Sequence, residues 1–305
     1  MSGDNEKAVL QTFCCASCGI AEIDDIKLVP CDGCDLVKYC SDECKRDHKS
    51  EHKEECKTRA AELRDELLFK QPESTHKGDC PICMVPLPIH GNKSVIYCCC
   101  SKLICYGCVV ANTQRNMEMR LPHSCPFCRE STFITDEEQD KLEMKRIEMN
   151  DPVAICKEGG KQYDKGEYRS AFEYWTKAAV LGEIEAHYRL SHLYREGKGV
   201  EKDEGKEIFH MEEAAIGGHP NARHNLGAHE WKQRNVERAV KHWVIAARQG
   251  NDNSMKTLLD FFKEGYLNKD DLAATLRAHK AAADATKSKL RDFAEKVWLE
   301  KCSLE

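Results

Sequence analysis

Four pairs of metal-binding residues follow one another near the start of the chain: Cys15-Ala-Ser-Cys18, Cys31-Asp-Gly-Cys34, Cys40-Ser-Asp-Glu-Cys44 and His52-Lys-Glu-Glu-Cys56. A second series comes after them: Cys80-Pro-Ile-Cys83, Cys98-Cys99-Cys100, Cys105-Tyr-Gly-Cys108 and Cys125-Pro-Phe-Cys128. Two thiolates separated by two residues can hold one metal ion from a tight turn, and a tetrahedral zinc ion takes four such ligands. The sequence therefore predicts two small zinc-stabilised fingers. We name residues 14–56 the first finger and residues 79–130 the second finger.

The cysteines are concentrated in one part of the chain, since 17 of the 19 lie between Cys14 and Cys128. A disulfide framework of this density would require an oxidising compartment. The polar start, Met-Ser-Gly-Asp-Asn-Glu-Lys, does not have the apolar core of a signal peptide, and no apolar run approaches the roughly 20 residues of a membrane span. We therefore expect reduced, zinc-bound thiols, no membrane partner, and an intracellular location in the cytoplasm or nucleus.

The charge of the chain gives no general attraction to polyphosphates, because the formal net charge is −6 over 305 residues. Nucleic-acid binding usually shows as a basic face or stripe. Basic residues do gather between Lys45 and Lys70, but acidic residues alternate with them, as on a solvated helix face. We expect no nucleic-acid partner.

The first finger ends in a predicted helix, which Ser41 can cap and which continues to Leu68. On this helix His52 and Cys56 are four residues apart, so both side chains project from one face. The order of the pairs resembles the MYND-type zinc finger, with all eight ligand positions present in sequence between Cys15 and Cys56.

The resemblance implies two interleaved zinc sites, the first formed by Cys15, Cys18, Cys40 and Cys44 and the second by Cys31, Cys34, His52 and Cys56. Cys14 is an alternative to Cys15, and His48 is an alternative to His52; we favour Cys15 and His52. MYND fingers typically bind proline-containing peptides with help from a Gln and a Trp after the sixth ligand. Here Lys45 and Lys49 stand in those places, so the resemblance supports the zinc fold more than the peptide-binding role.

The second finger resembles a RING finger, a module that recruits ubiquitin-conjugating enzymes. The positions that usually touch this partner are matched by Ile82 inside the first pair, Pro126 inside the last pair and Arg129 just after it. An arginine suits this place because its planar guanidinium group donates several hydrogen bonds at fixed geometry.

The central ligands of the second finger depart from the RING pattern. Cys80, Cys83, Cys105 and Cys108 form a complete first site in this resemblance. Lys102 stands where the fourth ligand is expected, and a protonated lysine does not bind zinc. The second site then uses Cys100, Cys125, Cys128 and a fourth group chosen from Cys99, Cys98 and His123, of which we favour Cys99. The two fingers together predict three to four zinc ions.

From Asp151 onward the sequence repeats. Ala154, Ala186 and Ala222 open equivalent helices and Ser254 takes the next place, at spacings of 32, 36 and 32 residues. One position for a large side chain holds Trp175, then Met211, then Trp243, which we interpret as core residues. The pattern resembles Sel1-type repeats, which are related to the tetratricopeptide array and form an all-α solenoid. Five histidines of this region lack ligand spacing and are expected at the surface: His187, His192, His210, His224 and His242.

The predicted fold is therefore multidomain, with two zinc-stabilised cross-brace fingers followed by a Sel1-like α-solenoid. We divide the chain into a flexible tail (1–13), the first finger, a helix and linker (57–78), the second finger, a helical linker (131–150), the repeat array (151–266) and C-terminal helices (267–305). We expect these last helices to shield the final repeat.

All three resemblances are to modules that contact other proteins, and no catalytic constellation stands out in the sequence. The first hypothesis is a zinc-binding scaffold or adaptor built from MYND, RING-like and Sel1-like modules. The alternative is a RING-type E3 ubiquitin-protein ligase, in which the repeats and the first finger recruit substrates and the second finger binds a ubiquitin-conjugating enzyme. Ile82, Pro126 and Arg129 favour the ligase, and Lys102 at a ligand position favours the adaptor.

Overall fold

A computed structural model describes residues 14–22, 26–89, 93–132 and 135–302. The tail predicted for residues 1–13 lies outside these ranges. The chain divides into two compact units, Met1–Lys70 and Gln71–Glu305, and each is described by itself. No helix within the described ranges is long and apolar enough to cross a membrane.

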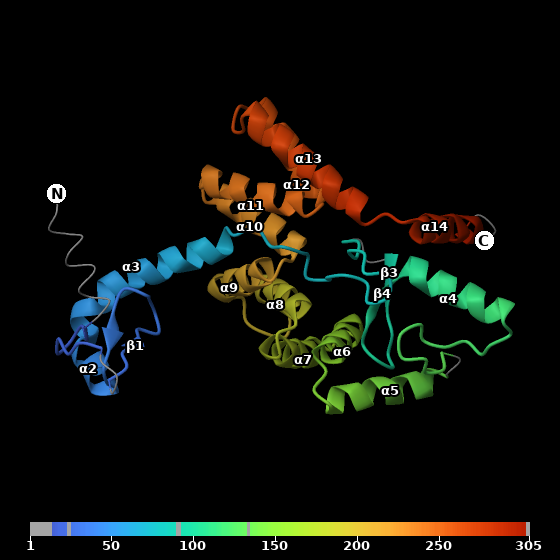
Figure 1. The fold of residues 1–305 in the computed structure, drawn as a ribbon, viewed down its shortest axis with the longest axis horizontal. Helices are drawn as coiled ribbons and strands as arrows, with labels where there is room; N and C mark the ends of the chain where they lie inside the picture. Colours follow the sequence, from blue (N-terminus) through green and yellow to red (C-terminus); the bar gives the residue numbers. More distant parts are fainter. Residues whose placement is uncertain (1–13, 23–25, 90–92, 133–134, 303–305) are drawn as a thin grey trace. The chain divides into compact units, whose positions relative to one another are not determined.

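The first unit consists of a small hairpin and two helices (blue in Figure 1). Strands β1 (Val29–Pro30) and β2 (Lys38–Tyr39) pair antiparallel and are followed by α2 (Asp42–Asp47) and α3 (Lys49–Leu68). Ser41 caps α2 as predicted, because its Oγ accepts a 3.2 Å hydrogen bond from the Cys44 N–H. The buried hydrophobic residues described in the finger are few: Cys15, Leu28, Cys34, Val37 and Tyr39. A core of this size needs a further source of stability, which metal ligation can supply.

In the second unit, the described residues of the second finger form one hairpin and one helix. Strands β3 (Ser94–Ile96) and β4 (Leu103–Cys105) pair antiparallel, with Ser94 opposite Cys105, and α4 (Tyr106–Glu118) follows directly. The core of the finger consists of Leu87, Ile104 and the ligand cysteines. The next helix, α5 (Asp136–Glu148), begins at a capping box in which the Thr135 side chain and the Glu138 side chain each accept the other residue's backbone N–H. This capping box sets the start of the helix within residues 131–150.

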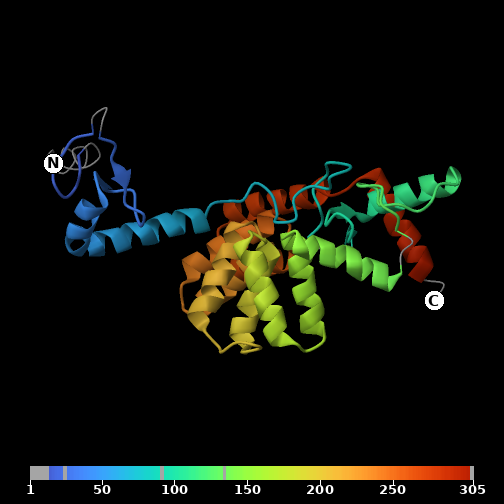
Figure 2. The same ribbon diagram turned by 90° about the horizontal axis from the view of Figure 1, so that it is seen from below.

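The repeat array is formed by antiparallel helix pairs that stand side by side in Figure 2. Its helices are α6 (Pro152–Asp164), α7 (Tyr168–Val180), α8 (Ile184–Glu196), α9 (Glu204–Ile216), α10 (Pro220–Lys232), α11 (Val236–Arg248) and α12 (Asp252–Lys263). The first helix of each unit is capped at equivalent positions, where a side chain accepts a backbone N–H of the first turn: Asp151, Glu183, His219 and Asn251. These caps precede the repeated alanines and Ser254 by three residues, which explains the regular spacing of the helix starts.

The large residues of the repeats are core residues, as predicted. Trp175, Met211 and Trp243 are each 3% exposed. The histidine prediction was wrong. His242 is fully buried, and the other four are half-buried because they pack between neighbouring helices. For example, His187 Nδ1 lies 3.0 Å from His210 Nδ1 across the α8–α9 contact.

The two C-terminal helices pack on different parts of the unit. Helix α13 (Lys269–Ala285) packs against α11 and α12 and so covers the end of the array, as expected. Helix α14 (Lys289–Cys302) packs against α4 of the second finger instead. Figure 1 shows this pair, with α14 in dark red beside α4 in green. The expectation that all of residues 267–305 shield the last repeat therefore holds for α13 and not for α14.

Candidate metal centres

Four clusters of metal-binding side chains are present in the described residues of the two fingers. In the first, Cys15, Cys18, Cys40 and Cys44 converge, with Cys40 Sγ 3.5 Å from Cys18 Sγ and 3.6 Å from Cys44 Sγ. The turn before β1 supplies Cys15 and Cys18, the β2–α2 connection supplies Cys40, and the first turn of α2 supplies Cys44. The chain's own hairpin therefore brings together ligands that lie more than twenty residues apart in sequence.

The second cluster contains Cys31, Cys34, His52 and Cys56. Cys31 Sγ lies 3.6 Å from Cys56 Sγ, and His52 Nε2 lies 3.1 Å from Cys34 Sγ. His48 lies outside the cluster. Its Nδ1 is 3.2 Å from the hydroxyl oxygen of Tyr39, a group that burial keeps protonated by raising its pKa to about 12. The structure thus brings His52, and not His48, to the cysteines.

The third cluster, in the second finger, is formed by Cys80, Cys83, Cys105 and Cys108. The sulfur of Cys80 lies 3.9 Å from that of Cys108, and the sulfur of Cys83 lies 3.7 Å from that of Cys105. Backbone N–H groups support the thiols, since the Cys105 N–H points at Cys80 Sγ and the Cys108 N–H points at Cys105 Sγ, each at 3.5 Å. Such donors favour the thiolate form that binds metal.

The fourth cluster contains Cys99, Cys100, Cys125 and Cys128. The Cys99 and Cys128 sulfurs lie 3.3 Å apart, and the Cys100 and Cys125 sulfurs lie 3.8 Å apart. The two alternatives for the fourth ligand, Cys98 and His123, are not members of this group. The Lys102 ammonium group lies 5.8 Å from the centroid of the Phe127 ring, where it can make a cation–π contact.

These spacings fit tetrahedral zinc. Zn–S bonds of about 2.3 Å at tetrahedral angles place two ligand sulfurs about 3.8 Å apart. The sulfur–sulfur distances above run from 3.3 to 3.9 Å, well beyond a disulfide bond. All-thiolate and three-thiolate-plus-imidazole ligand sets are those of structural zinc sites. In both fingers the two clusters draw on alternating pairs along the chain, which is the cross-brace arrangement.

The three residues predicted to contact a conjugating enzyme have different environments. Ile82 is 40% exposed, and Arg129 is exposed with its guanidinium Nη1 donating to Asn112 Oδ1 at 3.1 Å. Pro126 is buried, so the expected contact through its ring is not available in this conformation. The neighbouring Phe127 is 45% exposed instead, because its backbone N–H turns inward to Cys125 Sγ while its side chain stays outside.

Two features of the second unit escaped the sequence reasoning. Arg291 of α14 reaches the turn that follows Cys83, and its Nη2 lies 3.6 Å from that thiol. His76 of the linker stacks on His219, with ring centroids 4.2 Å apart, and both imidazoles approach the Glu185 carboxylate. No spacing rule signals either one, because each partner lies far away in the chain.

The cluster of His76, Glu185 and His219 is a further group of possible ligands, but its geometry opposes metal binding. His219 Nδ1 accepts the Ala222 N–H, so the proton of the neutral ring is on Nε2, the atom that faces Glu185. The nearly parallel rings, inclined by 19°, cannot both direct a lone pair at one ion. The cluster is therefore a hydrogen-bonded contact between the linker and the repeats.

Comparison with protein families gives independent assignments. The model of the MYND finger family matches residues 15–56, which include the first two clusters. The Sel1 repeat model matches three times, at residues 153–183, 184–219 and 222–251. The chain contains a MYND finger and three Sel1 repeats. The RING-like character of the second finger rests on its cysteine clusters.

Individual relatives cover parts of the chain. It is 36% identical over 69 residues to the chitin synthase regulator SKT5 of Saccharomyces cerevisiae, a match that covers 23% of this chain and 10% of the regulator. A Sel1 repeat protein from Oxalobacter formigenes is similar in structure, with a TM-score of 0.43, 28% identity, and coverage of 50% of this chain and 65% of that one. The protective antigen c5321 of uropathogenic Escherichia coli, with an SLR fold, gives a TM-score of 0.38 and 24% identity, covering 53% of this chain and 36% of that one. The chain spans less than two thirds of each of these relatives.

MYND fingers and Sel1 repeats are both modules of protein–protein interaction. The MYND finger implies zinc binding, and the matched residues include all eight members of the first two clusters.

Proposed function

We propose that this chain is a zinc-dependent adaptor that holds different proteins together through its two compact units. The observation that carries this proposal is the presence of a MYND finger and a Sel1 array in one chain, each in its own unit. A chain that needed only a stable fold would gain nothing from carrying two kinds of binding module. Two binding modules joined by a linker raise the effective concentration of one partner near the other.

Zinc has a structural role in this proposal, with four ions per chain, two in each finger. The donor sets and sulfur spacings of all four clusters support this count. The first two sites would fold the MYND finger. The other two would hold together the turns that carry the cysteine pairs of the second finger, next to α4.

The MYND finger of this chain would recognise its partners in its own way. Lys45, one of the two residues at the places of the family's Gln and Trp, forms an ion pair with Asp32. An ion pair at this place favours a charged or polar partner segment over a proline-rich one. One segment of the chain is similar to part of a yeast chitin synthase regulator. This similarity fits an adaptor that acts on an enzyme.

The adaptor proposal is tested by separating the two units. Tagged residues 1–70 and tagged residues 71–305 are used as baits, and the full chain is used in a sequential two-step purification. We expect each unit to retain different proteins, and we expect those proteins to be recovered in one complex only with the full chain. Identical sets on both units, or no retention above a bait loaded with unrelated protein, would contradict the proposal.

A second candidate function is ubiquitin ligation by the second finger. The observation in its favour is the exposed pair of Ile82 and Arg129, with Arg129 held in place by Asn112. A RING finger works by positioning a charged conjugating enzyme. The burial of Pro126 weakens this candidate.

The ligase candidate is tested by ubiquitin discharge from a panel of charged conjugating enzymes. We expect Arg129→Ala to slow discharge with unchanged zinc content, and Ile82→Ala to weaken binding of the conjugating enzyme. Arg277→Ala is the matched control, because Arg277 is exposed on α13 in the same unit. If the full chain accelerates discharge from no enzyme of the panel, the adaptor function stands alone.

A further inference from the structure

The C-terminal helix α14 approaches the second finger very closely at one residue. A Cβ atom added at Gly107 of α4 would lie 2.9 Å from the backbone nitrogen of Arg291 and 3.0 Å from the carbonyl carbon of Leu290. Gly107 lies between the ligand residues Cys105 and Cys108. The glycine therefore lets the backbone of α14 come down beside the third metal cluster, and Ala294 one turn further is 1% exposed.

The side chain of Arg291 continues this contact onto the turn that carries the first ligand pair. Its Nη2 donates to the Val85 carbonyl at 2.9 Å and lies 3.6 Å from Cys83 Sγ. Its Nη1 donates to the Pro86 carbonyl at 2.6 Å and to the Thr286 carbonyl at 2.7 Å. The guanidinium group thus joins the start of α14 to the turn Cys80–Pro86.

When the third cluster holds zinc, the contact of Arg291 has an electrostatic effect as well. Four thiolates around a divalent ion leave a net negative charge on the site. A partly buried guanidinium beside such a site offsets that charge and donates an N–H···S hydrogen bond to a ligand sulfur. Arginine suits this place because one group can donate to the sulfur and to two carbonyl oxygens of the same turn at once.

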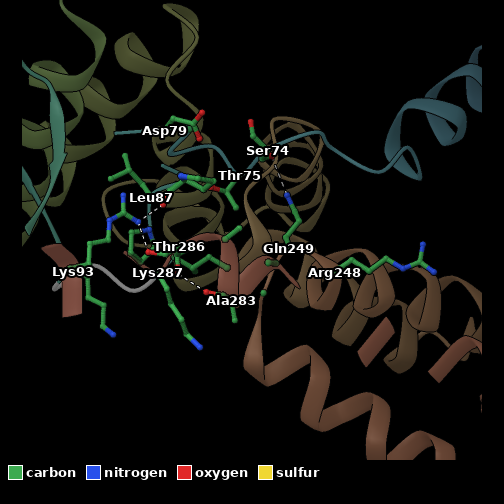
Figure 3. Close-up of a pocket in the computed structure, with 18 of the residues that line it drawn as sticks. Ser74, Thr75, Asp79, Leu87, Lys93, Arg248, Gln249, Ala283, Thr286 and Lys287 are labelled. Carbon is green, nitrogen blue, oxygen red and sulfur yellow. Dashed lines mark hydrogen bonds between the residues drawn. The ribbon is translucent and has the colours of Figure 1, made fainter. Parts of the chain in front are cut away.

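Figure 3 shows the surroundings of this contact, where a cavity of about 710 Å³ lies between the turn after Cys83, the linker 71–79 and the ends of α11 and α13. Leu87, Ser74, Gln249 and Ala283 line it from different elements. The cavity lies between the start of α14 and the repeat array. Helix α14 is held to the finger by Arg291 and by the 3.1 Å ion pair of Lys93 with Glu295.

We propose that Arg291 is a positioning residue of the zinc site formed by Cys80, Cys83, Cys105 and Cys108, and that α14 is a working part of the second finger. This inference rests on the proposed zinc content of that finger. It has a reciprocal consequence, because two linked equilibria affect each other equally. Loss of zinc from this site loosens α14, and undocking of α14 weakens zinc binding at this site.

The test compares zinc release from the full chain to a chromogenic chelator, with the initial zinc content read by native mass spectrometry. Arg291→Met removes the charge and the donors, Arg291→Lys keeps the charge and loses the fork, and Arg277→Met on α13 is the control. We expect one zinc ion of Arg291→Met to leave about 10- to 100-fold faster, because supporting residues of metal sites usually change the metal affinity by this factor and the change should appear in the release rate. Arg291→Lys should fall between, and Arg277→Met should match the wild type.

A spectroscopic measurement separates this role from a general loss of helix packing. In the cobalt-substituted chain, loss of an N–H···S hydrogen bond raises the energy of the sulfur lone pair and shifts the thiolate-to-cobalt charge-transfer band to longer wavelength. We expect this shift in Arg291→Met, which removes the donor, and an unchanged helical signal shows that the variant retains its fold. A wild-type chain with only two zinc ions would contradict the proposed zinc content. Four zinc ions with the same release rate and the same charge-transfer band in wild type and Arg291→Met would overturn the role of Arg291 alone.

Discussion

The indole N–H of Trp175 donates a 3.0 Å hydrogen bond to the backbone carbonyl of Cys156. The same bond recurs two repeats later, where Trp243 donates to the carbonyl of His224 at 3.1 Å. In both places the ring lies on a glycine of the facing helix, Gly159 or Gly227. In each of these two repeats the tryptophan ring therefore packs into a notch left by a glycine. The hydrogen bond satisfies the one polar atom of the indole.

The first prediction is that Trp175→Ala lowers the free energy of unfolding of the repeats by about 3–5 kcal/mol. The residue is 3% exposed and in contact with the core, so its removal leaves a cavity as well as a lost hydrogen bond. Urea unfolding followed by circular dichroism measures this difference. A loss below about 1 kcal/mol would show that the ring is not part of the core.

The second prediction concerns the notch, and the chain supplies its own control. A Cβ atom at Gly159 would lie 2.6 Å from Trp175 Cδ1, whereas nothing lies within 4 Å of one at Gly160. We expect Gly159→Ala to destabilise the repeats by about 1–3 kcal/mol, as overpacking does. Gly160→Ala, on the same helix, should be neutral or stabilising by up to about 1 kcal/mol. Equal effects of the two substitutions would refute the packing described for this helix pair.

The third prediction is that the repeats fold without metal. A fragment of residues 135–288 retains α5 to α13 and leaves out α14, which packs on the second finger. We expect the fragment to unfold cooperatively, with the same helical signal before and after treatment with a chelator. Chelation of the full chain should remove the structure of both fingers and leave that signal. A fragment that loses its helical signal on chelation would show that the division into domains is mistaken.

The fourth prediction is a loss of stability in acid of a longer fragment, residues 71–288, which retains His76 against His219. Burial lowers the pKa of His219 to about 4, against the opposing hydrogen bond with Glu185. Burial tends to raise the pKa of Glu185, but hydrogen bonds from His219 and His76 hold it well below its usual value in the full unit. Burial likewise lowers the pKa of His242 to about 3. As the pH falls below about 6.5, the histidines of the unfolded chain become protonated, whereas the buried histidines of the folded chain stay neutral.

The stability of the fragment is therefore full above pH 6.5 and falls as the pH decreases toward 4. Each such histidine should contribute a loss of about 1 kcal/mol between pH 7.5 and pH 5.5. Urea unfolding at the two pH values measures the sum. His242→Gln should reduce the slope between them, and a slope unchanged by this substitution and by His219→Asn would contradict the assignment.

Features that depend on residues close together in the chain could be predicted from the sequence, whereas features that depend on distant residues could not. The pairing of Cys15 with Cys18 and the cap at Ser41 depend on neighbouring residues, so their spacing was enough. The choice of Cys99 over Cys98 depends on which way one residue of a turn faces. Sequence could state the alternatives, and the backbone of the turn decides between them.

The features that sequence could not predict depend on contacts between distant segments. Arg291 is one of many charged residues on an ordinary helix, and only the approach of α14 to Gly107 gives it a special place. His76 lies in a polar linker, where nothing signals its stacking on His219. The burial of His242 was missed for the same reason, since polar residues at helix–helix contacts look like surface residues in the sequence.

The central claim is that the two fingers hold four zinc ions in the clusters described above. Native mass spectrometry of the purified full chain measures this directly, with Cys99→Ser and Cys98→Ser as a matched pair. We predict four zinc ions in the wild type and in Cys98→Ser, and three in Cys99→Ser. Two or fewer zinc ions in the wild type, or loss of an ion from Cys98→Ser and not from Cys99→Ser, would contradict the account.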